Sequence, residues 1–170
     1  MRSAASEPAY YAKKIAAKSF ERKLSASGRL VFDGPKFHVL VGFFNSGTVN
    51  EWRTPNTIAI RLLGRGDVYY AVVEYATSGR TQLKGFKTGV PVEWSIQYDP
   101  VGNGGSGSIA VTLGGETSVC HLAAGHKADG ATFDRFGLLT AIKSPDDSGE
   151  VWLDDIAIDG QTDHLARNTG

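Results

Sequence analysis

The sequence contains a single cysteine, Cys120, and no apolar stretch near the ~20 residues that a membrane-spanning helix requires. One cysteine excludes an internal disulfide, and the four histidines show no spacing typical of zinc ligands. The formal net charge is zero, because the 18 Lys and Arg residues balance the 18 Asp and Glu residues. We therefore expect no nonspecific binding to nucleic acid and no insertion into a membrane.

Glycine and apolar residues, by contrast, are plentiful. The 170 residues are 41% hydrophobic, which is enough for one well-formed core and too little chain for two comfortable domains. We expect a single domain over residues 1–170, with flexible flanks at 1–12 and 161–170. The 21 glycines fall mostly between apolar segments, a distribution typical of strands joined by tight turns.

Period-two alternation of apolar and polar residues predicts β-strands along most of the chain. The alternation is cleanest in Val92–Asp99, and Gly114-Gly115 predicts a two-residue hairpin turn. Tyr10–Phe20 fits either a short helix or an edge strand, so we expect nine to eleven strands in all. The other predicted strands are Lys23–Phe32, Phe37–Phe44, Thr57–Leu63, Asp67–Ala76, Ile109–Leu113, Thr117–Leu122, Asp134–Ile142 and Glu150–Asp159.

Short strands at regular spacing, without long helices between them, exclude a doubly wound α/β fold. Phe37–Phe44 and Asp67–Ala76 are apolar on both faces, as expected of strands that are covered on both sides. The sequence therefore predicts an all-β protein, built as an antiparallel β-sandwich.

Two segments near the end of the chain point to a known kind of sandwich. Phe133–Leu139, followed by Glu150–Asp159, resembles the closing strands of concanavalin A-like and carbohydrate-binding-module jelly rolls. Val41–Asn45, Glu51–Asn56 and Tyr98–Gly107 resemble parts of uncharacterised secreted bacterial proteins that carry such a sandwich. The resemblance implies a jelly roll and a non-catalytic, lectin-like module that binds a polysaccharide or oligosaccharide.

The same resemblance implies an extracellular or periplasmic location. Met1–Tyr11 does not show the basic segment and apolar stretch of a secretory signal.

The paired acids Asp154 and Asp155 lie in the last predicted strand, where strand alternation places their carboxylates on opposite faces. They are therefore not expected to act together as a catalytic acid pair. In the carbohydrate-binding modules with this ending, an Asp of the final strand often ligates a structural calcium ion, so we expect Asp154 or Asp155 to hold Ca²⁺. The alternative is that Asp155 accepts backbone N–H bonds or pairs with an arginine.

A sugar site pairs an aromatic platform with amide, guanidinium and carboxylate groups, because sugars present flat C–H faces and many hydroxyls. A loop between two apolar strands and the strands beside it supply such a set. In the structural alternative, Trp52 caps the core and Arg61 pairs with Glu74 across neighbouring strands. The predicted ligand-binding residues are Trp52, Arg53, Asn56, Arg61, Glu74 and Tyr75.

Two alternatives to a binding module stay open, a polysaccharide-active enzyme and a structural domain. A polysaccharide lyase on the same fold requires a proton acceptor and an arginine that neutralises a uronate, for which His38 or His121 with Tyr75 and Arg61 are candidates. A glycoside hydrolase would use two carboxylates. The third possibility is a structural or adhesion domain that docks to other domains of a larger secreted protein.

Overall fold

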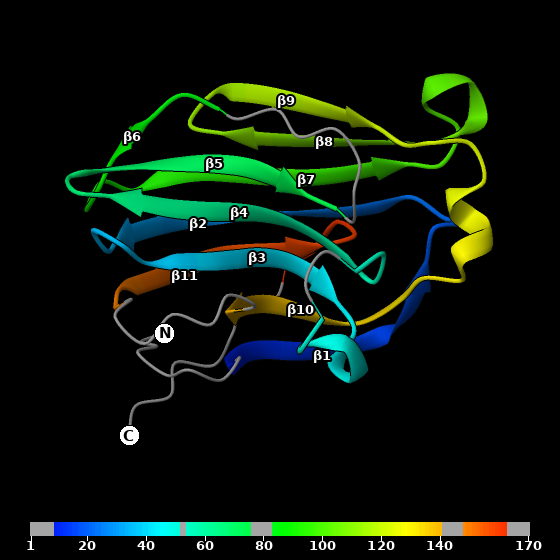
Figure 1. Ribbon diagram of the computed structural model, residues 1–170, viewed down its shortest axis with the longest axis horizontal. Helices are drawn as coiled ribbons and strands as arrows, with labels where there is room; N and C mark the ends of the chain where they lie inside the picture. Colours follow the sequence, from blue (N-terminus) through cyan, green and yellow to red (C-terminus); the bar gives the residue numbers. More distant parts are fainter. Residues whose placement is uncertain (1–8, 52–53, 76–82, 141–147, 163–170) are drawn as a thin grey trace.

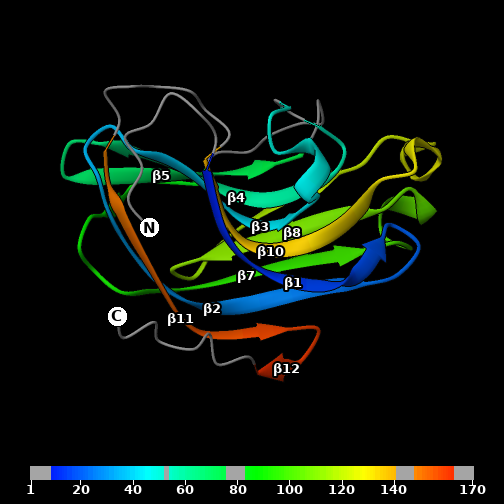
Figure 2. The same ribbon diagram turned by 90° about the horizontal axis from the view of Figure 1, so that it is seen from below.

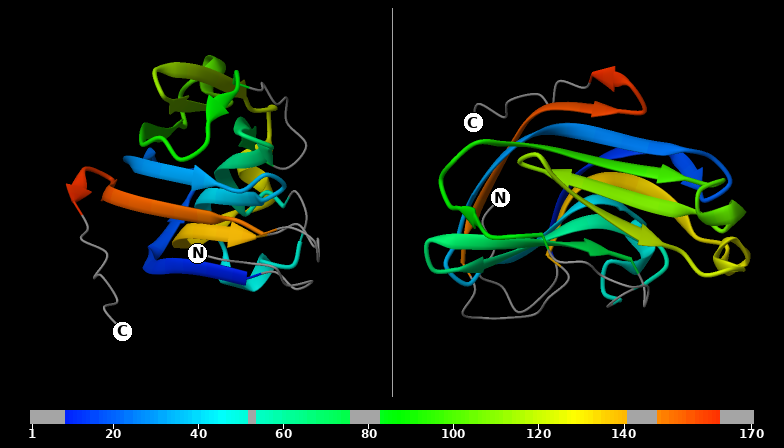
Figure 3. Two further views of the ribbon diagram at one scale, coloured as in Figure 1. Left: turned by 90° about the vertical axis from the view of Figure 1, so that its left-hand side faces the viewer. Right: turned by 90° about the horizontal axis from the view of Figure 1, so that it is seen from above.

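The computed structural model describes residues 9–51, 54–75, 83–140 and 148–162 of the chain. Within these ranges the chain forms two six-stranded antiparallel sheets that stack face to face (Figures 1 and 3). In the same part of the chain, no helix has the length and apolar character needed to cross a membrane. The short 3-10 helices are η1 (Ser46–Thr48), η2 (Asn103–Gly105) and η3 (His126–Asp129).

One sheet, which we call the β1 sheet, begins with an edge strand from the start of the chain. Its strands, in spatial order, are β1 (Ala9–Ser19), β10 (Thr132–Thr140), β3 (His38–Phe44), β4 (Thr57–Arg65), β5 (Val68–Glu74) and β6 (Phe86–Lys87).

The other sheet, which we call the β2 sheet, contains the strands nearest the end of the chain. Its spatial order is β12 (Gln161–Thr162), β11 (Glu150–Ile158), β2 (Leu24–Asp33), β7 (Val92–Asp99), β8 (Ser108–Leu113) and β9 (Glu116–His121).

The predicted antiparallel sandwich is confirmed, and every predicted strand lies within two residues of an observed one where the structure describes it. Tyr10–Phe20 forms the edge strand β1 and not a helix. The short strands β6 and β12 were not predicted, because two residues are too few to show alternation. Ala76 and Ile142, at the ends of two predicted strands, lie outside the described residues.

The predicted hairpin turn at Gly114-Gly115 is also confirmed. Both glycines have positive φ, 54° and 83°, which is the pattern of a type I′ turn. A side chain at Gly114 would in addition meet the ring of Phe86 at 2.7 Å. The turn fixes the register of β8 against β9, and it closes one end of the surface described below.

The hydrophobic core lies between the two sheets and is rich in aromatic side chains. The ring of Phe20 makes edge contacts with Tyr75, Tyr98 and Phe133, at centroid separations of 5.4, 4.8 and 5.2 Å. Burying one such side chain contributes roughly 1.5–3 kcal/mol. This core fixes which residue of each strand points inward, and therefore which residues point outward.

Both sheets curve in the same sense (Figure 2). The outer face of the β1 sheet is therefore concave, and the outer face of the β2 sheet is convex. We call them the concave face and the convex face.

Candidate functional site

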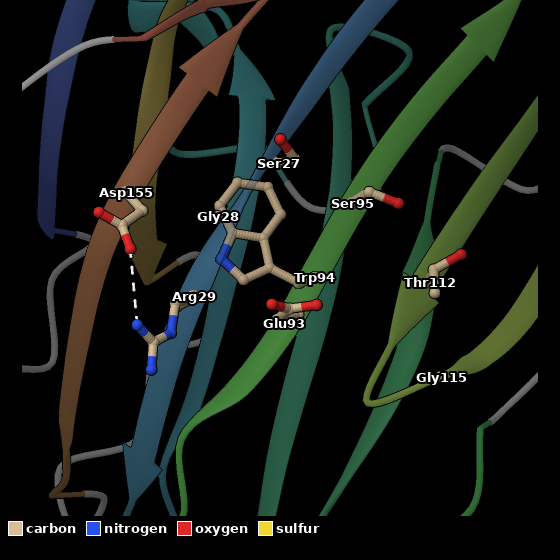
Figure 4. A pocket seen from close by; sticks show the side chains of 9 residues that line it. All are labelled: Ser27, Gly28, Arg29, Glu93, Trp94, Ser95, Thr112, Gly115 and Asp155. Carbon is tan, nitrogen blue, oxygen red and sulfur yellow. Dashed lines mark ion pairs between the residues drawn. The ribbon is translucent and has the colours of Figure 1, made fainter.

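A cleft of about 500 Å³ opens on the convex face, across β2, β7 and β8 (Figure 4). This volume lies within the range typical of small-molecule sites, about 300–1,000 Å³. Its lining mixes hydroxyl groups, two carboxylates and one guanidinium. The lining residues are Ser27, Gly28, Arg29, Glu93, Trp94, Ser95, Thr112, Gly115 and Asp155.

A row of four hydroxyl side chains crosses the convex face, and three of them, Ser27, Ser95 and Thr112, line this cleft. Ser27 on β2 is the register partner of Ser95 on β7, Ser95 is the partner of Thr112 on β8, and Thr112 is the partner of Thr117 on β9. Directly paired residues share a sheet face, and neighbouring strands lie about 4.8 Å apart, so the row extends over roughly 14 Å.

On the sandwich exterior, Ser27 and Thr117 are exposed, whereas Ser95 and Thr112 are half-buried. The Oγ1 atoms of Thr112 and Thr117 lie 2.9 Å apart and form a hydrogen bond. Each hydroxyl both donates and accepts, so the row offers paired donors and acceptors at regular spacing. We call these four residues the hydroxyl row.

A charged row lies beside the hydroxyl row, two residues along the strands. Arg29 on β2 is the register partner of Asp154 on β11 and of Glu93 on β7, so one guanidinium sits between two carboxylates. A third carboxylate approaches from β11, where Asp155 Oδ2 lies 3.6 Å from Arg29 Nη1 (Figure 4). All of these side chains are exposed on the convex face.

A bulge in β11 directs Asp155 toward Arg29. Register with β2 shifts between Asp154 and Ala157, and Asp155 has a positive φ of 52°, which aspartate tolerates better than most residues. Asp154 Oδ1 accepts a hydrogen bond from the backbone N–H of Asp155 at 2.9 Å, which closes the bulge. The expectation that strict alternation sends the two carboxylates to opposite faces is therefore wrong, because the bulge interrupts it and both are exposed.

An exposed tryptophan continues the convex face beyond the charged row. Trp152 is 51% exposed and is the register partner of Val31, next to the Asp154–Arg29 pair. A large aromatic ring left half in water is uncommon for a side chain that only packs. The ring provides a flat platform about two residues from the charged row.

Gly28, which lines the cleft, lets the Trp94 side chain and the backbone of β11 approach β2 closely. A side chain there would meet the indole of Trp94 at 3.0 Å and the Asp154 carbonyl oxygen at 2.9 Å, so glycine is required for close approach. The Trp94 indole packs inward and stacks on Phe136 at 5.9 Å. Its buried Nε1 has no hydrogen-bond partner among the described residues.

The concave face is different, because its centre is apolar and buried. Leu40, Phe44, Ala59 and Leu139 form a second hydrophobic cluster there, each at most 5% exposed. Ala12 and Val49 pack against this cluster. The outward-pointing residues at the centre of the β1 sheet therefore form a small hydrophobic cluster that is separate from the main core.

Two predicted ligand-binding residues meet on this concave face. Arg61 Nη1 lies 3.9 Å from Glu74 Oε2, and the two side chains are only 13% and 3% exposed. The structure thus brings Arg61 and Glu74 together as a buried ion pair. Their role in ligand binding stays a prediction.

Of the other predicted ligand-binding residues, the structure describes Tyr75 and Asn56, and both have contacts elsewhere. Tyr75 lies directly after β5 and packs into the core, where it is 3% exposed, and burial raises its pKa to about 12. Asn56 Oδ1 accepts a hydrogen bond from Thr132 N at 3.1 Å, which ties the loop after η1 to β10. Trp52 and Arg53 lie outside the described residues.

The histidines considered for a lyase are distributed over both sheets. His38 lies on the concave face with Arg61, whereas His121 lies on the convex face at the end of β9. Tyr75 faces the core between them. The grouping of His38 or His121 with Tyr75 and Arg61 is therefore not formed.

Calcium at Asp154 and Asp155 remains a prediction. Each carboxylate already has a partner, the Asp155 backbone N–H or the Arg29 guanidinium. The described residues contain no cluster of three or more His, Cys, Asp or Glu side chains suited to a metal ion. Calcium takes six to eight oxygen ligands, so these two residues alone do not fit a calcium site.

Sequence reasoning missed most of the convex site. Alternation in Val92–Asp99 correctly places Glu93 and Ser95 outward, but the partners of these residues on β2 and β8 depend on strand order, which sequence does not give. The outward exposure of Trp152 could have been found from its position between Val151 and Leu153, two apolar residues that alternation turns toward the core.

Comparison with known proteins identifies the fold as a jelly roll. No protein-family model matches the chain, and no curated protein matches it in sequence. Among solved structures, an alginate lyase from Pseudomonas aeruginosa matches with a TM-score of 0.58 and 12% identity over 82% of this chain. A family 7 alginate lyase in complex with substrate matches with a TM-score of 0.52 and 12% identity over 88% of this chain.

A tetrameric galectin from the ball sponge Cinachyrella is also similar, with a TM-score of 0.50 and 10% identity over 88% of this chain and 99% of its own. The chain spans 65% and 66% of the length of the two lyases. At these identities the similarity establishes a concanavalin-like jelly-roll fold, and it assigns no activity.

Proposed function

We propose that the protein is a non-catalytic carbohydrate-binding domain that holds a polysaccharide or oligosaccharide on its convex face. The observation that carries the proposal is the hydroxyl row of Ser27, Ser95, Thr112 and Thr117, which lies open on this face beside the charged row. Carbohydrate ligands present many hydroxyls, and such a row supplies complementary donors and acceptors.

The charged row adds stronger and directional hydrogen bonds. The Arg29 side chain is 54% exposed and retains accessible N–H donors beside its contact with Asp155. The carboxylates of Glu93 and Asp155 accept hydrogen bonds from sugar hydroxyls. Hydrogen bonds to charged groups are about twice as strong as those between neutral groups.

Trp152 completes the chemistry that a sugar site requires. Its exposed ring lies on the same face as Arg29, so a saccharide chain that stacks on the indole reaches the charged row with its next unit. The site thus combines an aromatic platform, charged groups and hydroxyls. That combination was predicted for this chain, although on other residues.

The jelly-roll neighbours support a carbohydrate ligand. One is a galectin, two are alginate lyases, and one of the lyases was solved with its substrate. They differ from one another in activity, since galectins are lectins and lyases are enzymes, so the fold alone does not choose between binding and catalysis. The open, polar, convex cleft favours binding.

A polysaccharide-active enzyme is the second candidate, and the concave face favours it. A buried ion pair such as Arg61–Glu74 is expensive to desolvate, and such groups concentrate at functional sites. His38 lies on the same face of the neighbouring strand β3. A lyase acting there would produce unsaturated uronates, which are detected by their ultraviolet absorbance.

Binding titrations with a panel of soluble polysaccharides and oligosaccharides test the proposal. We expect at least one saccharide to bind, and Trp152→Ala to weaken that binding at least about tenfold. Tyr11→Ala is the matched control, because Tyr11 is 53% exposed on the edge strand β1 of the other sheet. No binding to any saccharide, or equal loss in both variants, contradicts the proposal.

A further inference from the structure

The two sheets carry opposite charge, although the chain as a whole is neutral. The β2 sheet contains one basic side chain, Arg29, and seven acidic ones within its described strands. The described strands of the β1 sheet contain seven basic side chains and two acidic ones. The net charge of zero therefore conceals an acidic convex side.

The acidic character is concentrated at the cleft. Glu93, Asp154 and Asp155 surround the single guanidinium of Arg29, so the charged row carries two more negative charges than positive ones. Near the Gly115 end, Lys84 Nζ lies 2.7 Å from Glu116 Oε1, so this lysine is already compensated. A ligand on the hydroxyl row thus lies next to excess negative charge.

We infer that the convex cleft prefers saccharides with protonated amino groups to neutral saccharides, and neutral saccharides to uronic acids. This inference rests on the proposed function of the cleft. A sugar ammonium placed on the hydroxyl row comes within reach of the Glu93 and Asp155 carboxylates. A uronate carboxylate in the same position faces two or more like charges, and the single positive charge of Arg29 is already outweighed by the carboxylates around it.

The ligand class therefore differs from that of the lyase neighbours. Alginate, the polymer named in those lyases, is a polyanion. It lacks charge complementarity to the convex face of this chain. The fold is shared with proteins that act on an acidic polysaccharide, but the charge of this cleft selects against that class.

The size of the preference is limited by solvent. Two unit charges 4 Å apart interact with about 1 kcal/mol in bulk water, equivalent to about fivefold in affinity, and more near a protein surface. Because the charged row has two more carboxylates than guanidinium groups, we expect roughly a tenfold difference in affinity between glucosamine oligomers and uronate oligomers at low salt. Because these charges are exposed, high salt will remove most of the difference.

The experiment compares three oligosaccharides of equal length, made of glucosamine, N-acetylglucosamine or uronic acid. Titration calorimetry is done at mildly acidic pH, where the amine is protonated and the carboxylates are ionised. We expect affinity to fall in that order. Glu93→Gln keeps a hydrogen-bond acceptor but removes the charge, so it should weaken binding of the glucosamine oligomer several-fold more than binding of the neutral oligomer.

Asp33→Asn is the matched control for Glu93→Gln. Asp33 is an exposed acid on β2, four residues and therefore about 13 Å along the strand from Arg29, and the two variants are compared at physiological salt, where charges this far apart are largely screened. Its removal should not change the preference.

The possible outcomes distinguish a failure of the charge preference from a failure of the proposed carbohydrate binding. Uronate oligomers that bind most tightly, with the binding lost in Trp152→Ala, overturn the inference and leave the proposed function standing. An equal preference in Glu93→Gln and in the native protein also overturns the inference. Absence of binding to all three oligomers, and to the wider saccharide panel, removes the proposed function itself.

Discussion

The two outer faces of the sandwich are both formed by the outward-pointing residues of alternating strands, but these residues differ in burial. On the concave face, outward residues such as Leu40 and Phe44 are buried in a second hydrophobic cluster. On the convex face, outward residues such as Ser95 and Thr112 remain open and line a cleft. Alternation along a strand therefore tells which face of the sheet a side chain occupies. Whether that face stabilises the fold or is accessible to a ligand depends on how far its side chains are buried.

Truncation of Leu40 should produce the largest effect, because it removes a buried side chain from the concave face. We expect Leu40→Ala to lower the free energy of unfolding by about 2–4 kcal/mol. The matched change on the convex face, Val119→Ala, should lower it by less than about 1 kcal/mol, since Val119 is 44% exposed. Denaturant unfolding measures both. Equal losses would show that the two faces do not differ in burial.

The second comparison concerns the two arginine–carboxylate pairs. Removal of one partner of the buried Arg61–Glu74 pair by Glu74→Ala should destabilise the protein by about 3 kcal/mol. Asp155→Asn breaks the exposed pair with Arg29 and should cost only about 0–1 kcal/mol. Thermal unfolding of both variants checks this, and a larger loss in Asp155→Asn would reverse the ranking.

A buried histidine at the end of the sandwich should make stability depend on pH. Burial lowers the pKa of His126, whose Nε2 lies 3.1 Å from the Tyr98 hydroxyl. The unfolded state therefore binds the proton more readily, so stability is full above the unfolded value of 6.5 and falls as the pH drops through the lower folded pKa.

We expect the melting temperature to fall by a few degrees as the solution is acidified from about pH 8 to about pH 5. In His126→Gln this fall should be smaller, because the titrating group is gone. His121→Gln is the control, since His121 is exposed on β9. A pH profile unchanged in His126→Gln would assign the effect to other groups.

A single hydroxyl of the convex face should matter for binding and little for folding. Ser95→Ala removes one hydroxyl from the middle of the row and should weaken saccharide binding about two- to tenfold. Ser108→Ala removes a hydroxyl from the same face, at the far end of β8, and should leave affinity unchanged. Calorimetric titration and a melting curve on each variant separate binding from stability. Similar affinities in the two variants would remove the hydroxyl row from the site.

Calcium should have the smallest effect. Because Asp155 is paired with Arg29 and Asp154 closes the bulge, we expect calcium or a chelator to shift the melting temperature by less than about 1 °C. A larger rise with calcium, lost in Asp154→Asn, would establish the predicted ion site at the bulge of β11.

The fold could be predicted from the sequence because its signals are local. Alternation in Val92–Asp99 and the glycines at 114 and 115 are each visible within a few residues, and both appear in the structure as predicted. The helix-or-strand choice for Tyr10–Phe20 could not be made, since pairing with β10 decides it. Tertiary pairing, not propensity, makes this segment a strand.

The candidate site was less predictable because it depends on strand order and on one bulge. Ser27, Ser95 and Thr112 are far apart in sequence and meet only through the order of β2, β7 and β8. The bulge at Asp155 cancels the parity on which the interpretation of Asp154 and Asp155 depended. The Arg61–Glu74 contact, by contrast, lies within one hairpin and was anticipated.

The most direct test of the account is an NMR titration of the isotope-labelled protein with a saccharide that binds. We predict that amide signals of Ser27, Ser95, Thr112 and Thr117 shift with the ligand, together with the Trp152 indole signal. Signals of concave-face residues such as Leu40 and Arg61 should stay in place. Shifts confined to the concave face would contradict the central claim, that this jelly roll binds carbohydrate on its convex face.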